Sequence, residues 1–155
     1  MKLKDILSLT ILFFSLSACK TESAARNEIY GKWFQDRQSF HEVFDLRQDG
    51  VVEIITSVID RTNNKLLGYL SRSTGSYSLK GDSVIIKDLK IYIQLINGYT
   101  PPEYKKSIEE LPYSATINRT AYRPVFSENN RVLTLLFNCP SNADCVPYLT
   151  LTRVK

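Results

Sequence analysis

The chain has 155 residues, of which 20 are Lys or Arg and 16 are Asp or Glu, giving a formal net charge of +4. The two signs are interleaved, and no run of like charge is long enough to predict a nucleic-acid-binding patch. Residues 19–155, which follow an N-terminal export segment, are long enough for one domain with a real core and too short for two ordinary ones.

The first 18 residues have the layout of a signal peptide. A short basic start precedes an apolar run over residues 6–16, and small residues then lead into Cys19. The run is shorter than the stretch of about 20 residues that a permanent membrane-spanning helix needs. The sequence therefore predicts that residues 1–18 are removed during export.

Leu16-Ser17-Ala18-Cys19 resembles the lipobox of bacterial lipoproteins. In that family the cysteine thiol receives the lipid and the cysteine becomes the first mature residue, so the resemblance implies lipidation of Cys19. Stable anchoring takes more than one acyl chain, and bacterial lipoproteins carry several. The resemblance thus implies a lipid-anchored protein of the bacterial cell envelope. Lys20 in place of aspartate favours the outer membrane under the enterobacterial sorting rule. The alternative is an ordinary cleaved signal peptide or a buried helix.

Residues 20–28 are small and polar, and they are predicted to tether the lipidated cysteine to a domain over residues 29–155. Turn signals at residues 49–50, 63–64, 81–82 and 129–130 then separate segments rich in β-branched and aromatic residues. These segments predict strands over residues 29–34, 40–46, 51–60, 66–79 (one long strand or two short ones), 83–87, 89–96, 113–122, 132–139 and 148–154. Pro124 is expected to interrupt the β structure.

Residues 100–103, Thr-Pro-Pro-Glu, fit the start of a helix. Threonine caps helices well, proline is tolerated in the first turn, and Glu103 stands at the capping-box position. A short helix is predicted over residues 104–111, ended by Pro112. Eight or nine evenly spaced strands with one short helix predict a mainly β fold. We expect an antiparallel up-and-down β-barrel of about eight strands, with a β-sandwich as the alternative.

Gly31-Lys32-Trp33 resembles the Gly-x-Trp motif of lipocalins and related calycins. In that family an arginine of the last strand packs over the tryptophan ring, and Arg153 stands at the matching place. A Phe-x-Leu-x-x-Asp-Gly hairpin (residues 44–50) and a Gly-x-Tyr strand (residues 75–77) are similar to those of small Bacteroidota lipocalin-like lipoproteins. The resemblance implies that Gly31, Trp33 and Arg153 close the barrel, with a cation–π contact between the last two.

Cys139 and Cys145 remain as a pair once Cys19 carries lipid. An even cysteine count in an exported domain predicts a disulfide, here across the loop between the last two strands. A metal site is the alternative, but zinc or copper needs more ligands, and the single histidine, His41, is distant in sequence. No metal and no cofactor are predicted.

No catalytic arrangement is apparent, because His41 has no accompanying Gly-x-Ser-x-Gly elbow and no Gly-rich phosphate loop is present. The protein is therefore not predicted to be an enzyme. Tyrosines gather around the predicted helix, and their apolar rings with polar tips suit the mouth of a ligand site: Tyr92, Tyr99, Tyr104, Tyr113 and Tyr122. The alternative for each is a half-buried sheet tyrosine.

Two functions fit this sequence. The first is an envelope lipoprotein whose barrel binds a small apolar or amphipathic ligand. The second is a structural or protein-interaction lipoprotein whose barrel is filled by side chains and whose partner is another envelope protein. A barrel of eight strands can serve either purpose.

Overall fold

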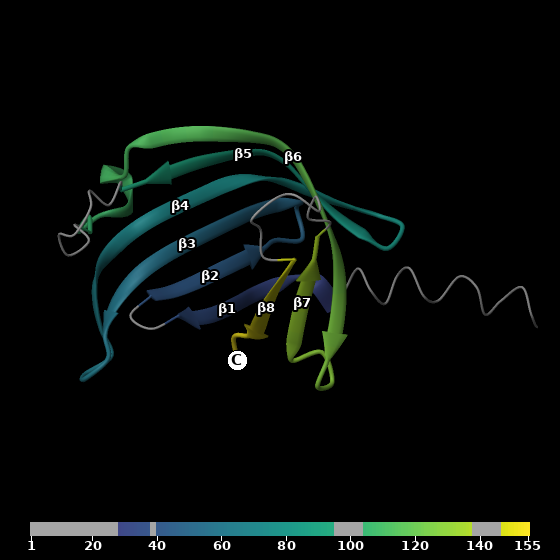
Figure 1. The fold of residues 1–155 in the computed structure, drawn as a ribbon, viewed down its shortest axis with the longest axis horizontal. Coiled ribbons are helices and arrows are strands. Elements are labelled where there is room, and N and C mark those ends of the chain that lie inside the picture. The colour runs from purple at the N-terminus through teal and green to yellow at the C-terminus, as the bar shows by residue number, and fades with distance from the viewer. Residues whose placement is uncertain (1–27, 38–39, 95–103, 138–146) are drawn as a thin grey trace, which may run out of the picture.

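The computed structural model describes residues 28–37, 40–94, 104–137 and 147–155. Eight antiparallel strands follow one another in chain order and close into a barrel, because the first strand pairs with the last (Figure 1). The strands are β1 (Gly31–Arg37), β2 (Phe40–Leu46), β3 (Val51–Asp60), β4 (Lys65–Lys80), β5 (Ser83–Ile93), β6 (Tyr113–Ser127), β7 (Val132–Leu136) and β8 (Tyr148–Arg153). The predicted antiparallel barrel is confirmed, and the sandwich alternative is excluded.

The bounds predicted from the hydrophobic pattern for β2 and β3 are the same as those in the structure. The segment predicted as one long strand or two short ones is a single long strand, β4. The segments over residues 83–87 and 89–96 are also one strand, β5, rather than two. They are joined through Asp88, which has a left-handed φ of 50° beside the register shift around Gly75. A β-bulge of this kind bends a strand without ending it.

The prediction that Pro124 interrupts the sheet is wrong. Pro124 lies inside β6 and pairs with Leu135 of β7. On its other side, the pairing of β5 with β6 stops at Val84 opposite Tyr122. Pro124 therefore has a strand neighbour on one side only, and its missing N–H removes no hydrogen bond from a central ladder.

The predicted helix over residues 104–111 is also wrong. The structure has only a 3₁₀ turn, η1 (Ile108–Glu110), capped by Ser107. Lys105 instead pairs with Tyr69 of β4 through two backbone hydrogen bonds of 2.7 and 2.9 Å. A helix of eight residues has little stability of its own, and here the sheet uses the backbone groups that the helix would need.

The core fills one end of the barrel. Its buried residues come from the segment before β1 and from seven of the strands: Ile29, Trp33, Phe44, Leu46, Val52, Tyr77, Val84, Ile86, Leu89, Leu133, Leu135 and Leu151. At this closed end β8 pairs with Trp33 and Phe34 of β1, and β7 pairs with residues 123–127 of β6. Burial of these side chains is the main term that favours the folded barrel.

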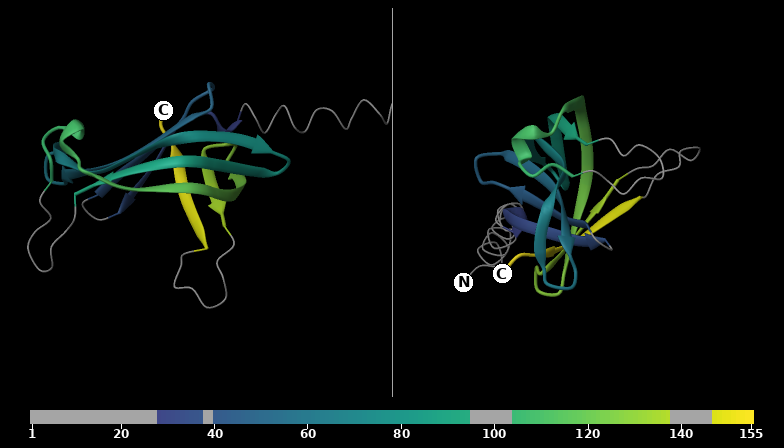
Figure 2. Two further views of the ribbon diagram at one scale, coloured as in Figure 1. Left: turned by 90° about the horizontal axis from the view of Figure 1, so that it is seen from above. Right: turned by 90° about the vertical axis from the view of Figure 1, so that its left-hand side faces the viewer.

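The other end of the barrel is not closed in the same way. Within the described residues, Gln35–Arg37 of β1 pair with β2 but not with β8, and residues 113–121 of β6 pair with β5 but not with β7. Figure 2 shows the reason: the short β7 and β8 cross the long β4 and β5 steeply, and β7 runs beside only residues 123–127 at the end of β6. The inner face of the long strands is therefore accessible at this open end.

Candidate ligand-binding site

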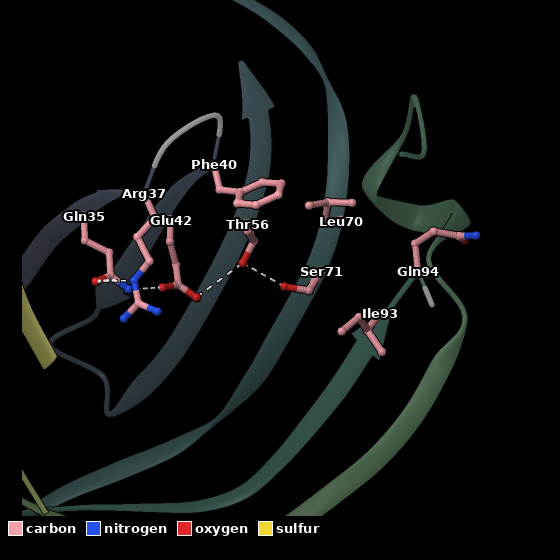
Figure 3. Close-up of a pocket in the computed structure, with 9 residues that line it drawn as sticks. All are labelled: Gln35, Arg37, Phe40, Glu42, Thr56, Leu70, Ser71, Ile93 and Gln94. Carbon is pink, nitrogen blue, oxygen red and sulfur yellow. Dashed lines mark hydrogen bonds between the residues drawn. The ribbon is translucent and has the colours of Figure 1, made fainter. Parts of the chain in front are cut away.

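A pocket of about 410 Å³ lies at the open end of the barrel. Five neighbouring strands, or residues adjoining them, supply its lining: Gln35, Arg37, Phe40, Glu42, Thr56, Leu70, Ser71, Ile93 and Gln94 (Figure 3). We call it the amphipathic pocket. Its volume is within the range of about 300–1,000 Å³ typical of small-molecule sites.

One row of residues across the sheet forms the polar side of the pocket. Gln35 is opposite Glu42, Glu42 is opposite Thr56, and Thr56 is opposite Ser71. Side chains that are direct register partners share one face of a sheet. Phe44 and Ile54, two positions deeper on β2 and β3, belong to the core or pack against it, so this polar row (Gln35, Glu42, Thr56 and Ser71) points into the barrel just above the core.

Hydrogen bonds connect the whole polar row. Gln35 Nε2 donates to Glu42 Oε2, Thr56 Oγ1 donates to Glu42 Oε1 at 3.3 Å, and Ser71 Oγ donates to Thr56 Oγ1 at 2.8 Å. Arg37 Nε adds a contact of 3.2 Å to Gln35 Oε1. Figure 3 shows this chain crossing β1 to β4 without a break. The row is thus held in one arrangement before any ligand arrives.

The apolar side of the pocket consists of Phe40, Leu70 and Ile93. Leu70 reaches it because of a β-bulge: Thr56 pairs with Ser71 and Ser57 with Tyr69, so that Leu70 has no partner on β3. An extra residue of this kind changes the direction of a side chain. Leu70 and Ser71 are consecutive, yet both line the pocket, one on its apolar side and one on its polar side.

Arg37 and Glu42 are the charged residues that line the amphipathic pocket. Arg37 is exposed, whereas Glu42 is half-buried between its two donors. Gln35 bridges them, with its amide oxygen toward Arg37 and its amide nitrogen toward Glu42. The pocket therefore has a solvated positive margin and a more enclosed negative centre.

The three residues expected to close the barrel lie at the opposite end from this pocket. Trp33 of β1 and Arg153 of β8 are direct register partners. Gly31 begins β1 with a φ of 122°, a conformation that L side chains rarely adopt. The chain turns there from Ile29 and Tyr30 into the first strand.

The predicted tyrosines that the structure describes do not line the amphipathic pocket. Tyr92 stacks edge-on with Tyr113, with ring centroids 5.8 Å apart, and Tyr104 lies 4.8 Å beneath the Lys106 ammonium. Tyr122 packs against Phe137 and lines a separate hollow of about 360 Å³. The described tyrosines thus lie in separate contacts, and Tyr99 lies outside the described residues.

Cys19, Cys139 and Cys145 also lie outside the described residues, as do the predicted signal peptide and almost all of the predicted tether. His41 is on β2, and its Nδ1 is 2.7 Å from the Asp36 carboxylate near the surface. Among the residues that the structure describes, no three His, Cys, Asp or Glu side chains gather as a metal site would require. The helical segments in that same part of the chain are too short to cross a bilayer.

Sequence reasoning missed the polar row, although one signal for it was present. In β2, Phe40, Glu42, Phe44 and Leu46 occupy the same face, and Glu42 is the single charge in that apolar series. Its partner Thr56 similarly follows Val52 and Ile54 on the inner face of β3. A carboxylate on a core-facing position needs hydrogen-bond partners, and this requirement could have identified the site.

Comparisons with known protein families, with curated proteins and with solved structures find no match to this chain. The structure itself defines a closed eight-stranded barrel with an amphipathic pocket at one end. A function for this chain is therefore inferred from that geometry and from the sequence motifs.

Proposed function

We propose that this protein is an envelope lipoprotein whose barrel binds a small amphipathic ligand at its open end. The observation that carries the binding function is the amphipathic pocket, where the hydrogen-bonded polar row faces Phe40, Leu70 and Ile93 across about 410 Å³. Apolar walls supply affinity by removing ligand surface from water, and a few fixed polar groups supply orientation.

Pre-organisation supports this function. A ligand that enters the pocket does not need to order Glu42, because Gln35 and Thr56 already hold its carboxylate. Ordering a long side chain costs about 0.5–1.5 kcal/mol on binding. The polar row avoids that loss.

Titration with a neutral naphthylamine dye, whose fluorescence rises in apolar surroundings, tests the proposal. Ser71→Phe places a ring in the pocket and should abolish saturable binding. Ser76→Phe makes the same substitution on the exposed outer face of β4 and should bind like the parent protein. Absence of saturable binding to the parent protein, or equal binding by both variants, would exclude this pocket as the ligand site.

The anchor is part of the same proposal and rests on Leu16-Ser17-Ala18-Cys19. Acyl chains on Cys19 would place the barrel at the bacterial outer membrane, with residues 20–28 as the tether. Mass spectrometry of the purified protein should find an acylated N-terminal Cys19. Cys19→Ser should move the protein from the membrane fraction to the soluble fraction, and an unmodified mature N-terminus would refute lipid anchoring.

A second candidate is a structural or protein-interaction lipoprotein. It is favoured by the closed end, where Trp33, Leu133 and Leu151 are fully buried and fill the interior with side chains. Under this alternative the open end is simply an unfilled margin of the barrel. The dye titration separates the two functions, because a filled structural barrel gives no saturable binding that Ser71→Phe can remove.

A further inference from the structure

We infer that the amphipathic pocket selects ligands whose head group donates hydrogen bonds, an alcohol or a protonated amine, over ligands with a carboxylate head. This inference rests on the ligand-binding function proposed above and names the chemical class of the ligand. It follows from the direction of the hydrogen bonds along the polar row.

The carboxylate of Glu42 fixes that direction. An ionised carboxylate only accepts hydrogen bonds, so Thr56 Oγ1 must donate its single proton to Glu42 Oε1. Thr56 can then only accept from Ser71, and Ser71 must donate its own proton to Thr56. Both hydroxyl protons are consequently committed within the row.

The hydrogen bonds of Gln35, on the β1 side of Glu42, are also directed toward the carboxylate. Gln35 donates from Nε2 to Glu42 Oε2, which leaves its Oε1 to accept from Arg37 Nε. Donors thus converge on Glu42 from both neighbouring strands. Toward the ligand, Ser71 Oγ and the Glu42 carboxylate present unused lone pairs, which are acceptors.

A ligand donor matches these acceptors. A hydroxyl or ammonium group next to Ser71 and Glu42 satisfies their lone pairs, while the tail contacts Leu70 and Ile93 on the apolar side of the pocket. A carboxylate head in the same place has no proton to donate to the acceptors of Ser71 and Glu42. Its negative charge would also lie beside that of Glu42. Desolvated polar groups without partners are strongly unfavourable.

Arg37 is the charged group of the lining that would favour a carboxylate instead. It is exposed and lies at the β1 margin of the pocket, whereas Glu42 is half-buried at the centre of the row. Charges in solvent are screened more effectively than partly enclosed ones. Glu42 therefore dominates the preference for the head group.

Competition between the neutral dye and decanol, decylamine or decanoate tests this preference, since the three compounds share one tail length. We expect decanol and decylamine to displace the dye at concentrations roughly tenfold or more below decanoate, because a hydrogen bond to a charged group is worth that much. Decanoate binding as tightly as decylamine would overturn the inference and leave the proposed function intact. Failure of all three with a dye that binds would also overturn it.

Glu42→Gln isolates the responsible group. The glutamine oxygen can still accept from Thr56, and the Gln35 amide can turn its oxygen toward the new amide nitrogen, but the negative charge is gone. Decylamine should lose about tenfold in affinity and decanoate should gain. Decanol, which keeps an acceptor but loses the charged one, should lose less than decylamine. Glu53→Gln is the matched control, because Glu53 is also a strand carboxylate but pairs with Arg47 and Arg72 away from the pocket. Equal effects of the two variants would refute the role assigned to Glu42.

Discussion

The guanidinium carbon of Arg153 lies 4.5 Å from the centre of the Trp33 ring, and the two residues are direct partners across β1 and β8. Arg153 Nη2 donates to the carbonyl oxygen of Glu28 and contacts that of Tyr30 at 3.5 Å. Trp33 is fully buried, and its Nε1 donates to the Ile29 carbonyl at 2.9 Å. This pair joins the first strand, the last strand and the segment that enters the barrel.

Trp33→Phe should therefore lower the free energy of unfolding by roughly 1–3 kcal/mol, because the buried Ile29 carbonyl loses its donor and Arg153 loses its preferred aromatic face. Urea denaturation of the two proteins measures the difference. Tyr148→Phe, a substitution at an exposed aromatic position of β8, should stay close to the parent protein. A Trp33→Phe variant of unchanged stability would show that the pair does not hold the barrel closed.

Tyr77 should make the barrel less stable at high pH. Its hydroxyl donates to the Arg47 carbonyl at 2.7 Å, and burial raises the pKa of this phenol above its usual value of 10.0. Above about pH 10 the unfolded chain loses the tyrosine proton while the folded chain keeps it, so the free energy of unfolding falls as pH rises.

Urea midpoints measured at increasing pH should thus decline more steeply for the parent protein than for Tyr77→Phe. The same variant should lose about 1 kcal/mol at neutral pH, where the lost hydrogen bond is the main effect. Parallel pH profiles for the two proteins would contradict the assignment to Tyr77.

Gly75→Ala should destabilise the bulge between β4 and β5. An added Cβ would lie 2.7 Å from the Lys87 carbonyl oxygen and 3.0 Å from the Leu89 Cα, and both are backbone atoms that cannot rotate away. A loss of roughly 1–3 kcal/mol in unfolding free energy is expected, measured by thermal or urea denaturation. Ser76→Ala, at the exposed next position, is the control and should change little. Equal stability of both variants would mean that β5 can shift to accept the methyl group.

The disulfide between Cys139 and Cys145 stays a prediction. In the mature, unreduced protein neither cysteine should react with a maleimide, and both should react after reduction. Cys139→Ser should free the thiol of Cys145 and lower stability by about 2 kcal/mol, since the loop between them is short. Labelling of the parent protein without reductant would exclude the bond.

Much of the barrel could be predicted from local pattern. The alternation in β2 and β3 and the glycines at 50 and 81, which have positive φ of 82° and 59°, locate strands and turns because each depends on neighbouring residues alone. The helix prediction was wrong because the backbone of Lys105 pairs with that of Tyr69, a residue 36 positions away in the chain (105 − 69). The prediction that Pro124 interrupts the sheet was wrong because the sequence does not reveal that β5 stops pairing with β6 before Pro124.

The sequence by itself determined the mainly β class and the positions of most strands, and it predicts an export signal with a lipobox, because these are encoded by composition and spacing along the chain. Tertiary structure alone decided that Gln35, Glu42, Thr56 and Ser71 form one row and that the bulge brings Leu70 in beside it. The physical reason is register. Residues far apart in the chain become neighbours only when strands pair, and the polar row at the open end of the barrel exists only in that pairing.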